Sequence, residues 1–295
     1  MTSDETINFR TEHRTAPQKT VLIIDFSNLA YSSFYAAIYR DGISLENVKP
    51  DYRGHLATFR SQLSHLLTES KASRVIFALD QHPESKHRIL PGYKAKRKPK
   101  LFDPKHLLMQ EIQTMIEGLY IQSNFSGLEI QTCQATGEEA DDVIATLALL
   151  YHESESVFVA SCDKDLWAIM VLPNVRVFNF QTRTYASQKL LQEKFGIDKF
   201  EHISLVKSLF GDASDNIINL LPRSQAQLLP IINASDGTLE SFLSELEAVS
   251  LRVSSKCRAA VLEKTPDLYI HFEVIALHFG LDLIFSGQPK ASETG

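Results

Sequence analysis

Three short apolar runs mark the first two thirds of the chain, and each ends in an aspartate. They are Thr20–Asp25, Arg74–Asp80 and Val157–Asp163. None alternates apolar with polar positions, which predicts strands buried on both faces, as in a parallel sheet. Apolar residues at helical spacing separate the runs, over roughly 53–70, 105–122 and 140–151. Strands that alternate with helices predict an α/β fold with right-handed crossovers.

The order of these patterns divides the chain into four parts. Residues 1–18 are polar and predict a flexible tail, and residues 19–186 form the predicted α/β domain. Residues 187–286 carry mostly helical patterns, for instance Phe200–Phe210, and are expected to form a helical DNA-binding region. Residues 287–295 predict a second loose tail.

Composition restricts the class of protein. The 295 residues are 44% hydrophobic and 22% charged, which fits a globular chain with a sizeable core. No apolar run approaches the roughly 18 residues of a transmembrane helix, and the polar N-terminus does not resemble a signal peptide. The three cysteines are far apart in the sequence, which favours free thiols in a reducing cytoplasm over disulfides or a zinc site.

Positive and negative charges are segregated along the chain. The net charge of −6 argues mildly against a general nucleic-acid coat protein. Between Lys86 and Lys100, however, there are seven lysines and arginines and no acid. The acids gather in short motifs elsewhere, so each kind of charge needs its own explanation.

The three strand-terminal aspartates should meet at one edge of the sheet. Ligand sites form at the carboxyl ends of parallel strands, which is where Asp25, Asp80 and Asp163 are expected. One aspartate after a strand is often only a helix N-cap, but three in succession are harder to explain in that way.

Further acids follow in the same region of the predicted fold. Four acids within five residues, Glu138–Asp142, open a predicted helix, which is more than the helix dipole needs. Asp165 comes soon after Asp163, and Asp212 and Asp215 form another pair. If these carboxylates converge, they repel one another unless cations lie between them. An all-oxygen ligand set favours Mg²⁺, or Mn²⁺ in its place, and two ions about 4 Å apart would suit phosphodiester hydrolysis.

Taken together, these motifs resemble the flap endonuclease / 5′-nuclease (5′-3′ exonuclease) superfamily, which includes phage ribonuclease H and the nuclease domain of polymerase I. The matching stretches are VLIIDFSNLAY near residue 25, VIFALD at 75–80, YKAKRK at 93–98, GEEADDVIATLA at 137–148, VASCDKDL at 159–166 and GDASDNI at 211–217. The resemblance implies a PIN-like twisted sheet flanked by helices and a helical arch at about 84–108. It also implies a degenerate helix-hairpin-helix in the helical C-terminal region.

The resemblance assigns a metal-binding role to nine acids. Those implied for the ion nearer the attacking water are Asp25, Asp80, Glu139 and Asp141. Those implied for the second ion are Asp163, Asp165 and Asp215, with Asp141 or Glu139 shared. Asp142 and Asp212 match further acids of the family, which would act through water.

The basic segment is similar to the family's Tyr-Lys-x-x-Arg arch sequence. There Lys94 would lie over the scissile phosphate, Tyr93 would stack on a base, and Arg97 would bind phosphate. The other predicted nucleic-acid contacts are Lys86, Arg88, Lys96, Lys98, Lys100, Lys207 and Arg223. A solvated lysine-rich loop is the plainer alternative.

Two positions depart from the family's pattern. Ser32 stands where the family usually has an arginine that contacts the 5′ nucleotide, and Lys86 or Arg88 is the expected replacement. The family's glycine-rich hairpin is absent, because residues 216–228 contain no glycine. Close approach of the backbone to a phosphate is harder without glycine, which argues against a K⁺ site and points towards phage enzymes.

The expected function is that of a structure-selective 5′-3′ exonuclease and flap endonuclease. It would hydrolyse DNA, and RNA in RNA–DNA hybrids, with two Mg²⁺ ions during primer or flap removal. The expected setting is the cytoplasm of a bacterial or phage-infected cell. A monomer is expected, with no membrane partner and with a polymerase or single-strand-binding protein as a candidate partner. A PIN-type ribonuclease and a catalytically weak branched-DNA-binding protein remain alternatives.

Overall fold

The computed structural model describes residues 19–97, 102–117, 128–222, 224–248 and 253–287. The predicted tail at 1–18 and most of the predicted tail at 287–295 therefore lie outside the described residues, as do Lys98, Lys100 and Arg223.

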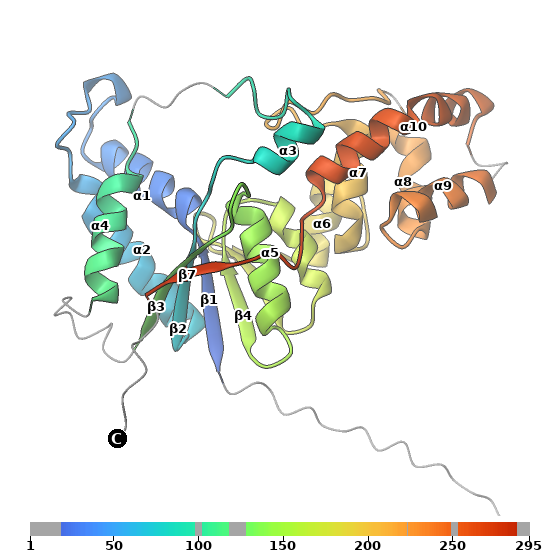
Figure 1. Cartoon of the computed structure of the whole chain (residues 1–295). Coiled ribbons are helices and arrows are strands. Elements are labelled where there is room, and N and C mark those ends of the chain that lie inside the picture. The colour runs from blue at the N-terminus through green and yellow to red at the C-terminus, as the bar shows by residue number, and fades with distance from the viewer. Residues whose placement is uncertain (1–18, 98–101, 118–127, 223, 249–252, 288–295) are drawn as a thin grey trace, which may run out of the picture.

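A seven-stranded sheet forms the centre of the molecule (Figure 1). Its strands are β1 (Thr20–Asp25), β2 (Arg74–Ala78), β3 (Glu129–Gln134), β4 (Ser156–Ala160), β5 (Val175–Asn179), β6 (Thr184–Tyr185) and β7 (Ile284–Ser286). Their order across the sheet is β6-β5-β4-β1-β2-β3-β7. The five inner strands are parallel, and the two edge strands are antiparallel to their neighbours.

Helices cover both faces of this sheet. The helices are α1 (Phe26–Arg40), α2 (Gly54–Ser70), α3 (Glu84–Ile89), α4 (Lys105–Ile116), α5 (Ala140–Tyr151), α6 (Gln188–Phe195), α7 (Ile203–Phe210), α8 (Gln225–Ala234), α9 (Leu239–Ala248) and α10 (Ser255–Ile275). The 3-10 helices in the described part of the chain are η1 (Leu45–Asn47), η3 (Asp165–Val171) and η4 (Phe200–His202).

The burial of β1 explains its unbroken apolar run. Leu22 and Ile24 pack into the core under α2 and α4, while Val21 and Ile23 pack into the core under α5. Both faces of the strand are therefore covered, and alternation would place polar groups in an apolar layer. The parallel α/β arrangement expected from the sequence is confirmed, with antiparallel edge strands added.

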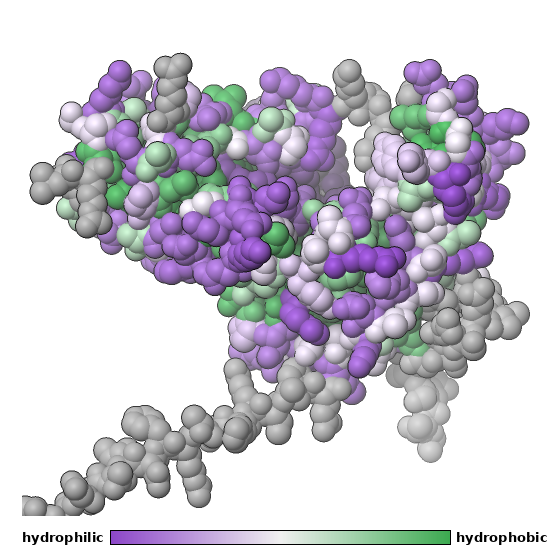
Figure 2. Space-filling model, turned by 180° about the vertical axis from the view of Figure 1, so that it is seen from behind, coloured by the Kyte–Doolittle hydropathy of each residue, from purple (hydrophilic) through white to green (hydrophobic). Residues whose placement is uncertain are grey.

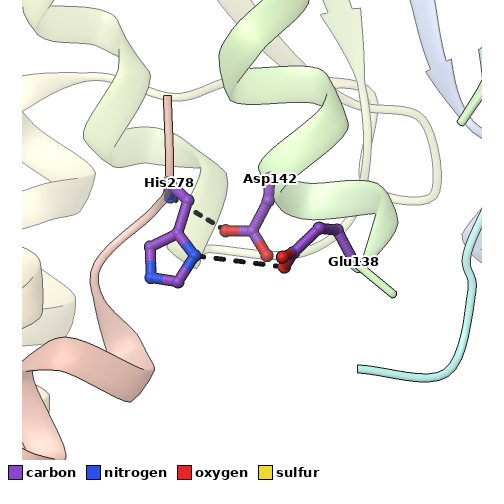
Figure 3. Close-up of side chains that lie close together, drawn as sticks. All are labelled: Glu138, Asp142 and His278. Atoms are coloured by element: carbon purple, nitrogen blue, oxygen red, sulfur yellow. Dashed lines mark hydrogen bonds and ion pairs between the residues drawn. The ribbon is translucent and has the colours of Figure 1, made fainter. Parts of the chain in front are cut away.

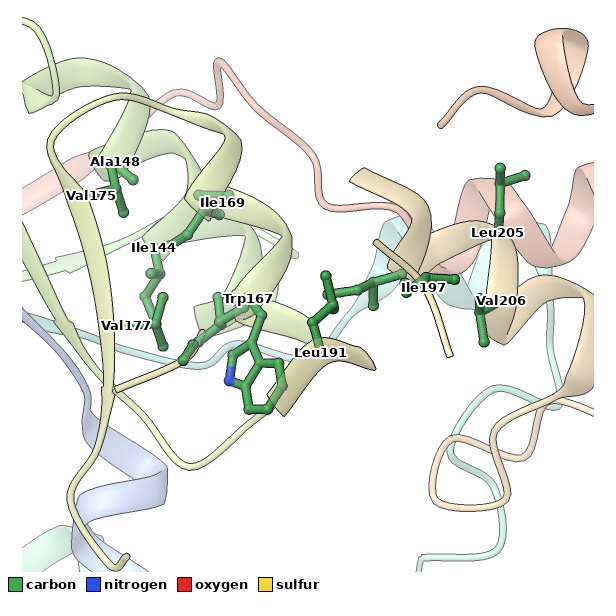
Figure 4. Close-up of a cluster of buried hydrophobic side chains, with 14 of the residues drawn as sticks. Ile144, Ala148, Trp167, Ile169, Val175, Val177, Leu191, Ile197, Leu205 and Val206 are labelled. Carbon is green, nitrogen blue, oxygen red and sulfur yellow. The ribbon is translucent and has the colours of Figure 1, made fainter. Parts of the chain in front are cut away.

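The C-terminal helices share a continuous core with the sheet. Figure 4 follows this core from Ile144 on α5 through Trp167 and Leu191 to Leu205 on α7. After α10 the chain returns to the sheet and pairs as β7 with β3. The region predicted as mostly helical thus supplies one edge strand, and its core is continuous with that of the α/β part.

The predicted arch is helical only at its two ends in the described residues. Helix α3 covers six residues, and residues 91–96 form consecutive turns.

Hydrophilic side chains cover most of the face of the molecule drawn in Figure 2. Within the described residues, no helix is both long and apolar enough to cross a membrane.

Candidate metal centre and nucleic-acid interface

Five acids predicted as metal ligands line one cavity of about 1010 Å³. They are Asp25, Asp80, Glu139, Asp141 and Asp163. The register of the sheet explains why three of them meet, because Asp25 pairs with Ala78 at the end of β2 and Ile24 pairs with Ala160 at the end of β4. The carboxyl ends of three adjacent strands are thus level beside this cavity.

Neutral donors orient the strand-end carboxylates. Asp25 accepts hydrogen bonds from the backbone N–H of Asn28 and the hydroxyl of Ser161, both at 2.9 Å. Asp80 accepts one from the backbone N–H of Ala140 at 3.1 Å, at the start of α5. These bonds fix the carboxylates without neutralising them.

Four of the five carboxylates at the strand-end cavity form no ion pair with the residues that the structure describes. None of the ion pairs in the described part of the chain involves Asp25, Asp80, Asp141 or Asp163. Burial, with the neighbouring Asp80, raises the pKa of Asp25 to about 7. Burial and the charges of Asp163 and Asp25 also raise the pKa of Asp141. Carboxylates in this arrangement are suited to binding cations.

Glu139 lies on the same cavity but is surrounded by donors. Lys94 Nζ lies 2.5 Å from Oε1, while Lys86 Nζ and the Tyr93 hydroxyl lie 3.2 and 2.7 Å from Oε2. Burial alone would raise the pKa of Glu139, but Lys86 and Lys94 outweigh it and lower the pKa to about 2. Glu139 is therefore ionised across the physiological range.

A second acid cluster adjoins the first. One carboxylate oxygen from each of Asp165, Asp212 and Asp215 lies within 4.8 Å of the others. Asp165 and Asp212 line a smaller cavity of about 400 Å³, and Asp163 lines both cavities. Lys207 contacts Asp165 and lies 2.6 Å from Asp212, so this cluster already contains a cation.

Opposing effects act on the pKa values in this second cluster. Burial and the charge of Asp163 raise the pKa of Asp165 to about 6, against the effect of Lys207. Burial also acts to raise the pKa of Asp212, but hydrogen bonds from Lys207 and Ser214 lower it to about 2.

A tight turn after α7 brings Asp212 and Asp215 into place. Gly211 has φ +80°, and a Cβ there would lie 2.7 Å from the backbone nitrogen of Asn219, so only glycine fits. Asp212 and Ile217 then exchange backbone hydrogen bonds. The carbonyl of Asp215 accepts from the backbone N–H of Lys94 at 3.0 Å, which joins this turn to the basic segment.

Two residues with predicted functional roles, Asp142 as a metal-binding acid and Lys86 as a nucleic-acid contact, lie in the interior. Asp142 is fully buried and lines neither cavity. Its Oδ1 accepts the backbone N–H of His278 at 2.9 Å, and its Oδ2 lies 2.7 Å from Lys86. Figure 3 shows His278, from the segment after α10, directed at Asp142 and Glu138. The structure thus places Asp142 outside the carboxylate cavity and pairs it with Lys86. The predicted roles of Asp142 as a metal ligand and of Lys86 as a phosphate contact stay predictions.

The other basic-segment residues have different environments. Tyr93 is only 3% exposed, since its ring packs against Ile217 and Val274, and this differs from the predicted base-stacking position. Arg97 Nη2 lies 2.7 Å from Asp215 Oδ1, yet more than half of its side chain is exposed. Arg88 and Lys96 are exposed, as a phosphate contact requires. Lys207 was predicted as a nucleic-acid contact, but its ammonium contacts the carboxylates of Asp165 and Asp212.

Sequence reasoning missed several residues that line the larger cavity, among them Asn28, Tyr31 and Arg183. Asn28 and Tyr31 lie on α1 just after Asp25, and Arg183 lies between β5 and β6. Arg183 adds a positive charge to a cavity wall where Ser32 stands in place of arginine. The Val175–Asn179 run was the available signal for Arg183, because the carboxyl end of that parallel strand lies at the same edge of the sheet.

Clustered carboxylates that can hold divalent ions are typical of sites that hydrolyse phosphodiesters, as in nucleases. The family model for the 5′-3′ exonuclease N-terminal resolvase-like domain matches residues 20–196. The chain therefore belongs to that family.

Named relatives agree with this assignment. The chain is 29% identical over 200 residues to a 5′-3′ exonuclease of Buchnera aphidicola subsp. Acyrthosiphon pisum, which covers 67% of this chain and 64% of that protein. It is 26% identical to flap endonuclease Xni of Photobacterium profundum, over 65% of this chain and 73% of that protein. It is also 26% identical to the thermostable DNA polymerase I of Thermus filiformis, over 90% of this chain and 29% of the polymerase. The match thus spans less than two thirds of the Buchnera protein and a smaller part of the polymerase.

Solved structures share the fold. The bacteriophage T5 5′-exonuclease with bound zinc superposes with a TM-score of 0.61 and 20% identity, over 88% of this chain and 90% of that chain. A T5 flap endonuclease described as a complex with DNA and metal ions gives a TM-score of 0.61 at 18% identity, over 88% and 89% of the chains.

Proposed function

We propose that this protein is a divalent-metal-dependent 5′-3′ exonuclease and flap endonuclease. The observation that carries the proposal is the cavity in which four acids that form no ion pair with any described residue lie beside Lys94 and Arg97. Membership of the 5′-3′ exonuclease domain family supports it. The names of the Buchnera and Photobacterium relatives, and the metal ions and DNA described for the T5 enzyme, support it further.

The donor set fits hard divalent cations. The residues that would hold one ion are Asp25, Asp80, Asp141 and Asp163, with Glu139 beside them. Those near a second are Asp165, Asp212 and Asp215. No histidine or cysteine is among these side chains, which favours Mg²⁺ or Mn²⁺ over Zn²⁺. Bound ions would supply an activated water and stabilise the charge on the leaving oxygen.

The protein's own cations would bind and orient the substrate. Lys94 lies on the wall of the carboxylate cavity, where a phosphate would meet its ammonium. Arg97 lines the same cavity with an exposed guanidinium that is suited to a second phosphate. Tyr93 would act indirectly, by holding Glu139 through its hydroxyl.

The substrates proposed are branched or 5′-ended DNA and RNA–DNA hybrids. Primer or flap removal in a bacterial or phage-infected cell would supply them. A polymerase or single-strand-binding protein would then be the natural partner, with this chain acting as a monomer.

Cleavage of 5′-labelled flap, nicked and RNA–DNA duplexes tests the proposal. We expect products with 5′-phosphates in Mg²⁺ or Mn²⁺, none in EDTA, and little in Zn²⁺. Robust cutting in EDTA would contradict metal dependence. Tight binding to branched duplexes without cleavage in any divalent ion would favour the non-catalytic alternative.

A further inference from the structure

The two acid clusters differ in how their negative charge is balanced. In the strand-end cluster, Asp25 and Asp80 receive hydrogen bonds only from neutral groups among the described contacts. In the second cluster every acid has a cation partner: Lys207 contacts Asp165 and Asp212, and Arg97 contacts Asp215. A divalent ion would therefore meet strong attraction at the first cluster and an ammonium at the second.

Lys207 is held firmly in that position. It lies in the last turn of α7, and the Gly211 turn folds Asp212 back beside it. Its Nζ lies 2.6 Å from Asp212 Oδ2 and also contacts Asp165 Oδ1, so one ammonium bridges two carboxylates. Only 15% of the side chain is exposed, so solvent screens this interaction weakly.

We propose that the Lys207 ammonium occupies the place of a cation in the second cluster, so that a divalent ion can bind there only by displacing it. The inference rests on the proposed function, since it concerns the ions that the nuclease would use. The resting protein then binds one divalent ion tightly at the strand-end cluster and a second one weakly. The phosphate of a bound substrate adds negative charge between the clusters, which would help to recruit the second ion.

Titration of the full-length protein with Mn²⁺ alone, by calorimetry and without nucleic acid, tests this inference. Wild type should show one tight binding event and one weak event. Lys207→Met should tighten the weak event at least about tenfold, because the competing charge is gone. Lys194→Met is the matched control, since Lys194 lines the same cavity but makes no ion pair with any residue that the structure describes. It should titrate like wild type.

Two equally tight events in wild type, or an unchanged weak event in Lys207→Met, would overturn the inference. An equal gain in Lys194→Met would also overturn it, because the effect would then be one of general charge. Since Lys207→Met leaves two acids without their partner, thermal melts provide a second measurement. Added Mn²⁺ should raise the Tm of Lys207→Met more than that of wild type, and an equal or smaller rise counts against the inference. A protein that titrates as expected but cuts no substrate contradicts only the proposed function.

Discussion

Replacing Lys86 tests whether this side chain stabilises the fold through a buried ion pair and does not contact a phosphate. Its ammonium lies 2.7 Å from Asp142 and 3.2 Å from Glu139, and the side chains of Lys86 and Asp142 are 3% and 0% exposed. In Lys86→Met, Glu139 keeps Lys94 and Tyr93, but Asp142 Oδ2 loses its partner in the interior. Removing one partner of a buried ion pair typically costs about 3–5 kcal/mol, and we expect a loss of this size in the free energy of unfolding.

Urea denaturation followed by circular dichroism, in EDTA, measures this loss. Arg88→Met is the matched control on the same helix, because its pair with Glu84 is largely exposed and should contribute less than about 1 kcal/mol. The double variant Lys86→Met with Asp142→Asn removes both charges and keeps an acceptor for His278. It should therefore regain at least about 1 kcal/mol relative to Lys86→Met alone, the size of coupling expected for contacting residues.

A loss below about 1 kcal/mol in Lys86→Met would refute the buried-pair interpretation. Wild-type stability combined with weaker nucleic-acid binding would instead restore the phosphate contact predicted from the sequence.

The remaining predictions concern the site itself. Lys94→Ala should lower single-turnover cleavage at saturating enzyme by at least about tenfold, or 1.4 kcal/mol, because a lysine near the reacting phosphate acts mainly in the transition state. Lys96 is exposed, so Lys96→Ala should instead weaken nucleic-acid binding and flatten its salt dependence. If Lys94→Ala changes only the affinity and Lys96→Ala changes the turnover, the proposed role of Lys94 in the transition state is wrong. Asp163→Asn should remove nearly all turnover, while duplex affinity measured in Ca²⁺ stays within a few-fold, because Asp163 lines both acid cavities. Near wild-type turnover would contradict its proposed role as a metal ligand. Exchange of K⁺ for Na⁺ at fixed ionic strength should leave duplex affinity unchanged, because residues 216–228 lack glycine, and a selective loss in Na⁺ would reveal a monovalent site.

The inner strands were predictable where burial on both faces produced an unbroken apolar run. Strand β3 was missed because Glu129–Gln134 contains buried polar residues, among them Gln131 and Thr132, and so has no such run. Strand β7 has three residues, and it exists because Phe285 pairs with Cys133 far away in the sequence. Local patterns contain no information about such a non-local pairing.

The positions of the acids were easier to predict than those of the cations. An aspartate at the end of a parallel strand is placed by the sheet itself, as Asp25 is. Lys86, Lys94 and Lys207 are long side chains whose partners depend on how helices and turns pack over the sheet edge. The run of lysines and arginines at 86–100 indicated a basic surface, but packing directs Lys86 and Lys94 towards Glu139. Lys207, on α7, is directed towards Asp212 in the same way.

The geometry of α5 explains why neighbouring acids in one motif have opposite surroundings. An α-helix has 3.6 residues per turn, so adjacent side chains point about 100° apart, whereas residues four apart share a face. Asp141 lines the carboxylate cavity, while Asp142 on the next position of α5 faces His278, as does Glu138 from the segment just before the helix (Figure 3). Asp141 and Asp142 therefore do not face the same cavity. The second aspartate instead anchors Lys86 and the segment that leads to β7, so the same turn of helix supplies a candidate ligand on one side and a structural link on the other.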